Sequence, residues 1–129
     1  MKTSILTRAL WVAAGSLSMT VAMAADVKLT LTGAQEVPAV TTQATGNGTI
    51  TIGMDNSVSG TITTSGIVGT AAHVHLAAPG KNGPPIITLT KKSDNEWSVP
   101  AGSKLTDEQA ASFKAGDLYV NVHSAANKG

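Results

Sequence analysis

Three histidines are the residues of this chain whose type and spacing point to chemistry. His73 and His75 lie one residue apart in the stretch AHVH, and His123 ends the apolar stretch DLYVNVH. Neutral imidazole is a common protein ligand for copper and zinc, and three imidazoles that leave one position open suit either ion. The chain has no cysteine, which excludes the blue-copper ligand set. If the three rings meet, the sequence predicts a metal site for copper in the first place and for zinc in the second.

Strand periodicity decides which face of a sheet these rings occupy. Successive side chains of a strand point to opposite faces, so His73 and His75 share one face and Val74 lies on the other. The same alternation separates His123 from Val122. If the two strands are neighbours with matching ends, the rings converge, and nitrogens within about 4 Å of one another could share one ion. The alternative interpretation stays open, because exposed strand faces and hydrogen-bonded structural histidines show the same pattern.

Alternation with a period of two also dominates the rest of the chain after residue 25. The segments VKLTLTG, GTITIGM, SVSGTITTSG, AAHVHLA, IITLT, EWSV and DLYVNVH predict about seven short strands. Asp55 and Asn56 predict a tight hairpin turn between the second and third of them. In KLTDEQAASFKAG, Thr106 and Gln109 have the spacing of a capping box, which predicts one short helix over about 106–115. The sequence therefore predicts an all-β, immunoglobulin-like antiparallel sandwich.

The N-terminal segment 1–24 has the pattern of a secretory signal peptide. Lys2 and Arg8 precede an uncharged, mostly apolar stretch that ends in AMA, the small-x-small pattern that signal peptidase accepts. We expect cleavage after Ala24, a mature domain of residues 25–129, and export to the periplasm or the outside of the cell. An uncleaved membrane anchor is the alternative. No later stretch is long and apolar enough to predict a membrane span.

Charge and motifs exclude several classes of function. The whole chain has a formal net charge of +1, but residues 25–129 hold seven lysines, no arginine and eight acids, so seven minus eight gives −1. Nucleic-acid binding usually needs a basic stripe with arginine, and we expect no nucleic-acid partner. There is no phosphate-binding glycine loop, no nucleophile elbow and no acid pair with a catalytic pattern. We therefore expect a protein without enzymatic activity.

Three stretches together resemble the CHRD domain, the module named after chordin that also occurs in exported bacterial proteins. The motifs EVP, AHVH, NGP and YVNVH occur in the order typical of that family. The stretches are LTGAQEVPAVTTQATGNGTITI (31–52), GTAAHVHLAAPGKNGPPIITL (69–89) and LTDEQAASFKAGDLYVNVHSAANKG (105–129).

The resemblance implies an immunoglobulin-like sandwich over residues 25–129 that is related in outline to copper/zinc superoxide dismutase. In the dismutases, the strand that is similar to His73 and His75 supplies copper ligands, and His123 has an approximate counterpart. Dismutases need further histidines, an aspartate for zinc and an arginine that guides the substrate. With three histidines and no arginine after residue 25, this chain is not expected to have dismutase activity.

The end of the sequence departs from the family pattern. CHRD domains usually continue past NVH with a glycine-rich turn and a last strand that carries an arginine, whereas this sequence stops at Gly129. We therefore expect an open sheet edge that a protein partner or a second copy of the chain would complete. Two functions are favoured: an exported metal-binding protein, or a non-catalytic extracellular interaction module without metal. A redox enzyme that uses a histidine-bound metal ranks last, because the sequence identifies no supporting acid and no charge that would guide a substrate.

Overall fold

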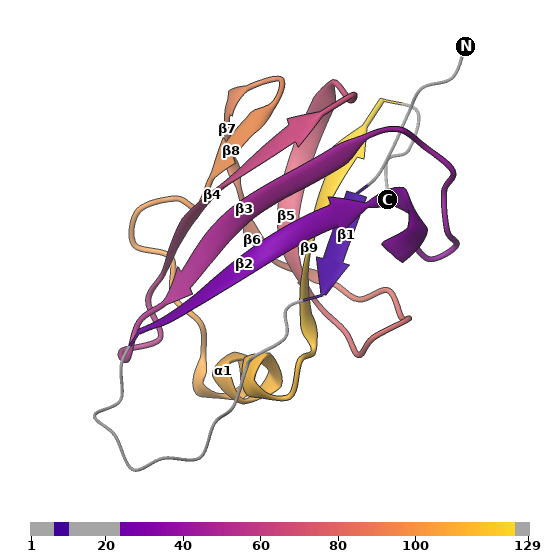
Figure 1. Ribbon diagram of the computed structural model, residues 1–129. Coiled ribbons are helices and arrows are strands. Elements are labelled where there is room, and N and C mark those ends of the chain that lie inside the picture. Colours follow the sequence, from indigo (N-terminus) through magenta and orange to yellow (C-terminus); the bar gives the residue numbers. More distant parts are fainter. Residues whose placement is uncertain (1–6, 11–23, 126–129) are drawn as a thin grey trace.

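The computed structural model describes residues 7–10 and 24–125, which form two antiparallel layers and a short helix (Figure 1). The all-β sandwich that the sequence predicts is confirmed. The helices are η1, a 3-10 turn (Gly33–Gln35), and α1 (Asp107–Lys114). The strands are β1 (Thr7–Leu10), β2 (Ala25–Thr32), β3 (Thr45–Ile52), β4 (Val58–Ser65), β5 (Gly69–Leu76), β6 (Pro85–Thr88), β7 (Thr90–Ser93), β8 (Glu96–Ser98) and β9 (Leu118–Ser124).

Hydrogen bonds connect the strands in the order β6-β5-β9-β1-β2-β3-β4-β8-β7. Strands β2, β3 and β4 form one layer, β5, β6 and β9 lie behind it, and β1 joins the two (Figure 1). Each neighbouring pair in this order is antiparallel. The layers meet through the aliphatic side chains that alternate along the strands, as the period of two predicts.

The core between the layers is almost entirely aliphatic. Each fully buried side chain of this kind contributes about 1.5–3 kcal/mol, so stability comes from many similar contributions. Trp97 and Phe113 are the aromatic members of this core. Its aliphatic members with no exposed area are Leu31, Ile50, Ile62, Ala72, Val74, Leu118, Val120 and Val122.

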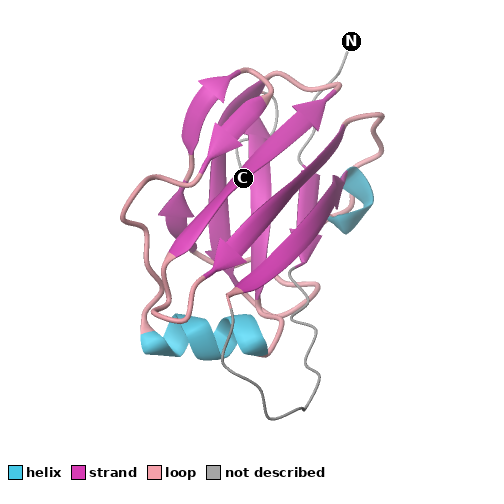
Figure 2. Cartoon of the chain, turned by 60° about the vertical axis from the view of Figure 1, so that its left-hand side comes forward, coloured by secondary structure: helices cyan, strands magenta, loops and turns pink. Residues whose placement is uncertain are grey.

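The predicted turn and helix are both present. Asn56 has a φ of 66° in the tight turn between β3 and β4, and the Oδ1 atom of Asp55 accepts from the backbone N–H of Ser57 at 3.1 Å. At the start of α1, the hydroxyl of Thr106 accepts from the backbone N–H of Gln109, whose own side chain accepts from the N–H of Thr106. The helix lies across one end of the sandwich (Figure 2).

Two features were not predicted. The apolar stretch IITLT does not form one strand, because β6 ends at Thr88 and β7 begins at Thr90, where the chain leaves β5 and pairs with β8. The other is β1. Most of the predicted signal peptide lies outside the described residues, but its residues 7–10 form this strand between β9 and β2. The outermost strands are therefore β6 and β7. Within the part of the chain that the structure describes, no helix has the length and hydropathy to cross a membrane.

Candidate metal centre

Strands β5 and β9 are antiparallel neighbours, and their register brings the three histidines to one face. His73 lies opposite Asn121 and His75 lies opposite Tyr119. Directly opposite residues of an antiparallel pair share a face. His123 lies opposite Ala71, two residues before His73 on β5, and is therefore on the same face. The expected convergence of the three side chains from two strands is present.

The three rings form a compact cluster. The ring centroid of His73 is 5.5 Å from that of His75 and 5.1 Å from that of His123, and those of His75 and His123 are 6.0 Å apart. One ring nitrogen from each residue lies within 4.8 Å of the others. Two nitrogens that share an ion through bonds of about 2 Å are at most about 4 Å apart. Small rotations about the side-chain bonds would therefore close the cluster around an ion.

The cluster is buried and its nitrogens are not all satisfied by the protein. His75 and His123 are 8% and 6% exposed, and His73 is partly buried. Neither ring nitrogen of His123, nor Nδ1 of His73, has a hydrogen-bond partner within the described ranges. Buried polar atoms are normally hydrogen-bonded, and those that are not require an explanation. A metal ion would satisfy one nitrogen of each ring, since the lone pair of a neutral imidazole is a suitable donor to copper or zinc.

Burial also keeps the rings of His73 and His123 neutral. The pKa of His123 is lowered to about 4, mainly by burial and to a smaller extent by the neighbouring His73 and His75. The neighbours contribute because a second positive charge beside the first is unfavourable. Burial lowers the pKa of His73 as well, with a smaller contribution from His75. A metal ligand must be unprotonated. At neutral pH these two imidazoles are in the form that binds metal.

The loop between β5 and β6 supports His75 from outside the cluster. The carbonyl oxygen of Gly83 lies 2.8 Å from Nδ1 of His75, and the N–H of Gly83 donates to the hydroxyl of Tyr119 at 3.0 Å. The rings of Tyr119 and His75 stack, with centroids 4.9 Å apart and planes 10° from parallel. The register of β5 against β6 also shifts between Val74 and His75. Such irregularities commonly re-aim a side chain near a functional site.

Gly83 and Tyr119 were not predicted as parts of the site. The NGP motif was visible in the sequence, but nothing in it indicated a bond to His75. The structure explains its glycine, because a Cβ on Gly83 would lie 1.8 Å from the carbonyl oxygen of Leu76. The preceding residue, Asn82, donates from its side chain to the carbonyl of Val37 at 2.9 Å. The NGP and EVP motifs are therefore joined in space, which agrees with their interpretation as structural turns.

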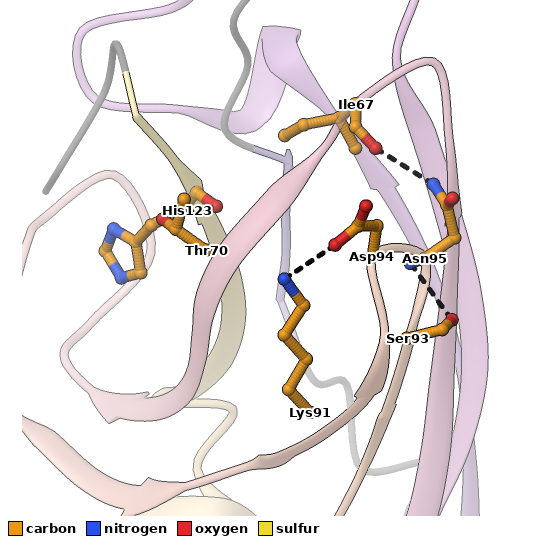
Figure 3. Close-up of polar contacts among 7 residues, drawn as sticks. All are labelled: Ile67, Thr70, Lys91, Ser93, Asp94, Asn95 and His123. Carbon is orange, nitrogen blue, oxygen red and sulfur yellow. Dashed lines mark hydrogen bonds and ion pairs between the residues drawn. The ribbon is translucent and has the colours of Figure 1, made fainter.

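A second set of polar contacts lies on β7 and in the turn between β7 and β8, and it does not face the histidines. Lys91 and Asp94 form an ion pair at 2.7 Å, and the side chain of Asn95 donates to the carbonyl of Ile67 at 2.9 Å. Figure 3 shows the ring of His123 pointing away from these residues. The metal-ligand cluster found in the described chain contains only the three histidines and no carboxylate. The donor set is therefore neutral.

Comparison with known proteins agrees with the motif order in the sequence. No curated protein and no solved structure matches the chain. A family model described as the CHRD domain matches residues 27–129. The match extends over β2 to β9 and includes all three histidines. Because it covers well over half of the sequence, the chain belongs to the CHRD domain family.

Proposed function

We propose that this chain is an exported copper-binding protein in which His73, His75 and His123 hold one ion. One observation carries the proposal: three imidazoles, two of them nearly inaccessible to solvent, have ring nitrogens within 4.8 Å of one another. An exported protein with such a site would bind and buffer copper outside the cytoplasm. Export itself is inferred from the signal-like segment 1–24.

The donor set favours copper over zinc for two reasons. For a given set of nitrogen ligands, Cu²⁺ binds more tightly than Zn²⁺. The cluster also has no carboxylate or thiolate to balance a double charge in a buried position. Because burying an uncompensated charge is costly, the singly charged Cu⁺ is the best match to three neutral imidazoles. A fourth position, for water or an exchanging ligand, remains available.

The test is a copper titration of the full chain, prepared without a polyhistidine tag. Cu⁺ is added without oxygen in competition with a coloured chelator, and Zn²⁺ is titrated separately. We expect one Cu⁺ per chain, at least tenfold weaker Zn²⁺ binding, and loss of the Cu⁺ site in His73→Ala and His75→Ala. Lys92 is exposed on β7, in the other layer, so Lys92→Ala is the matched control. Equal copper binding by a variant with all three histidines replaced by alanine would overturn the proposal.

A further inference from the structure

Strand β1 lies inside the sheet, although its residues belong to the expected signal peptide. It pairs with β9 on one side and with β2 on the other, antiparallel to both. Arg8, for example, lies opposite Asn121 of β9 and opposite Thr32 of β2. In the hydrogen-bonded order, β9 and β2 are connected only through this strand. Since both are antiparallel to β1, they run parallel to each other, two strand spacings or about 10 Å apart.

The same residues lie within the segment that is expected to be removed on export. Cleavage after Ala24 would take away β1, whereas β2 begins at Ala25, the first residue of the exported chain. Apart from the two pairings made by β1, the strand pairs would be unchanged. The exported domain would then contain a strand slot, which we define as the space between the backbone of 119–122 in β9 and the backbone of β2 around Thr32.

An empty strand slot would leave the β9 backbone groups that pair with β1 without partners. With β1 in place, Tyr119, Val120, Asn121 and Val122 on this side are 1%, 0%, 6% and 0% exposed, so removal of β1 would uncover an otherwise enclosed strand edge. An unpaired strand edge is a template for another strand. An extended peptide satisfies both sides of the slot at once, as β1 does.

We propose that the strand slot of the exported chain binds an extended segment of another polypeptide, at least four residues long, antiparallel to both β9 and β2. The backbone of that segment must be free of proline. We assign a basic residue to its position opposite Thr32, where the leader has arginine. The register sets this position, because Arg8 lies opposite Thr32 in the described strand pair.

The proposal does not depend on copper, although His123 and the strand slot belong to the same strand. It rests on the removal of residues 1–24, so the experiment makes that removal an explicit step. A specific protease site is inserted between residues 15 and 20 of the full chain, and the folded protein is cut there in metal-free buffer. Cutting separates β1 from β2 without altering any residue described in the structure.

A fluorescent peptide with the sequence of residues 5–12, ILTRALWV, is then added and its anisotropy is measured. We expect saturable binding of one peptide per cut chain, and at least tenfold weaker binding to the uncut chain, whose strand slot is filled. A peptide with Ala9→Pro should bind about tenfold more weakly, because it lacks one ladder N–H. A peptide with Arg8→Glu should also bind more weakly than the original.

Each result decides for or against the proposal. If the cut chain unfolds and the peptide refolds it, while the proline peptide does not, the strand slot needs an added strand and the proposal is supported. A cut chain that stays folded and takes up no peptide, or takes up the original and proline peptides equally, overturns it. So does a cut chain that light scattering shows to be a dimer which the peptide does not dissociate, because the occupant is then a second copy.

Discussion

The imidazole of His75 is fixed by Gly83, whose carbonyl oxygen lies 2.8 Å from Nδ1 of the ring. A carbonyl oxygen only accepts hydrogen bonds, so Nδ1 carries the proton and the lone pair is on Nε2. Metal-binding histidines commonly donate their second ring N–H to a carbonyl in this way, which fixes both tautomer and orientation. The NGP loop thus prepares His75 to bind an ion through Nε2.

Replacing Gly83 by alanine should lower the affinity for copper in a chain that still folds. The new Cβ would lie 1.8 Å from the carbonyl of Leu76, so the loop must move and the bond to His75 is lost. Loss of such a supporting bond typically costs 10–100-fold in metal affinity, by a general order-of-magnitude estimate. Competition titration of the variant measures this effect. The control is Gly80→Ala in the same loop, where a Cβ meets nothing within 4 Å but the φ of 79° strains the backbone, so it shows the effect of loop strain without the clash. Equal affinities in the two variants would contradict the role of Gly83.

The variant Tyr119→Phe tests the contribution of the hydroxyl separately from that of the ring. The variant keeps the ring that stacks on His75 but leaves the N–H of Gly83 without its acceptor at 3.0 Å. An unsatisfied donor costs about 1–3 kcal/mol when it is fully buried. Gly83 is only partly buried, so the free energy of unfolding in urea denaturation should fall by about 1 kcal/mol, the lower end of that range. Tyr119→Leu should lower it further, because the stacking is also lost. No difference between wild type and Tyr119→Phe would show that water replaces the hydroxyl.

The metal-free protein should lose stability as the pH falls through the range set by His123. The pKa of this residue is about 4 in the folded chain and 6.5 without the fold. Between these values the unfolded state binds the proton and the folded state does not, so stability is complete above pH 6.5 and falls progressively towards pH 4. A shift of this size corresponds to at most about 3 kcal/mol.

Urea denaturation at intervals between pH 7.5 and 4 tests this dependence. The variant His123→Phe removes the titrating group and keeps an aromatic ring in the same position on β9. Its free energy of unfolding should vary less with pH than that of the wild type over this interval. Parallel curves for the two proteins would mean that His123 is protonated in the folded chain as readily as in the unfolded chain.

The parts of the fold that could be predicted are those that local chemistry determines. Alternation along β2 places Val27, Leu29 and Leu31 in the core, and the Thr106–Gln109 spacing determines where α1 begins. The polar stretch before β3 could be a loop or a strand, and pairing with β2 and β4 decides that Thr45 begins the strand. The start of this strand depends on partners that are far away in the sequence, and the local periodicity carries no information about them.

The candidate site was predictable in its ligands but not in its surroundings. Alternation shows that His73 and His75 share a face, but not whether that face is covered, and all residues of β9 prove to be buried on both faces. The bond from His75 to Gly83 joins residues eight apart through a loop whose path no local rule specifies. The apolar composition of the segment around β1 fits an export signal and a strand equally well. The pairing of residues 7–10 with β9 and β2 was therefore not predictable from the local sequence.

Copper should stabilise the folded chain in proportion to its saturation. A ligand that binds only the folded state adds RT ln(1 + [L]/Kd) to the free energy of unfolding, or about 2.7 kcal/mol at a free copper concentration of 100 Kd. The midpoint temperature should therefore rise with chelator-buffered free Cu⁺ in wild type and Lys92→Ala, and stay constant in His73→Ala. His73 contributes a nitrogen to the cluster, and its Nδ1 has no hydrogen-bond partner among the described residues. The substitution thus removes a ligand without breaking a bond from that atom. A copper-dependent rise of equal size in His73→Ala would mean that the ion binds elsewhere on the chain.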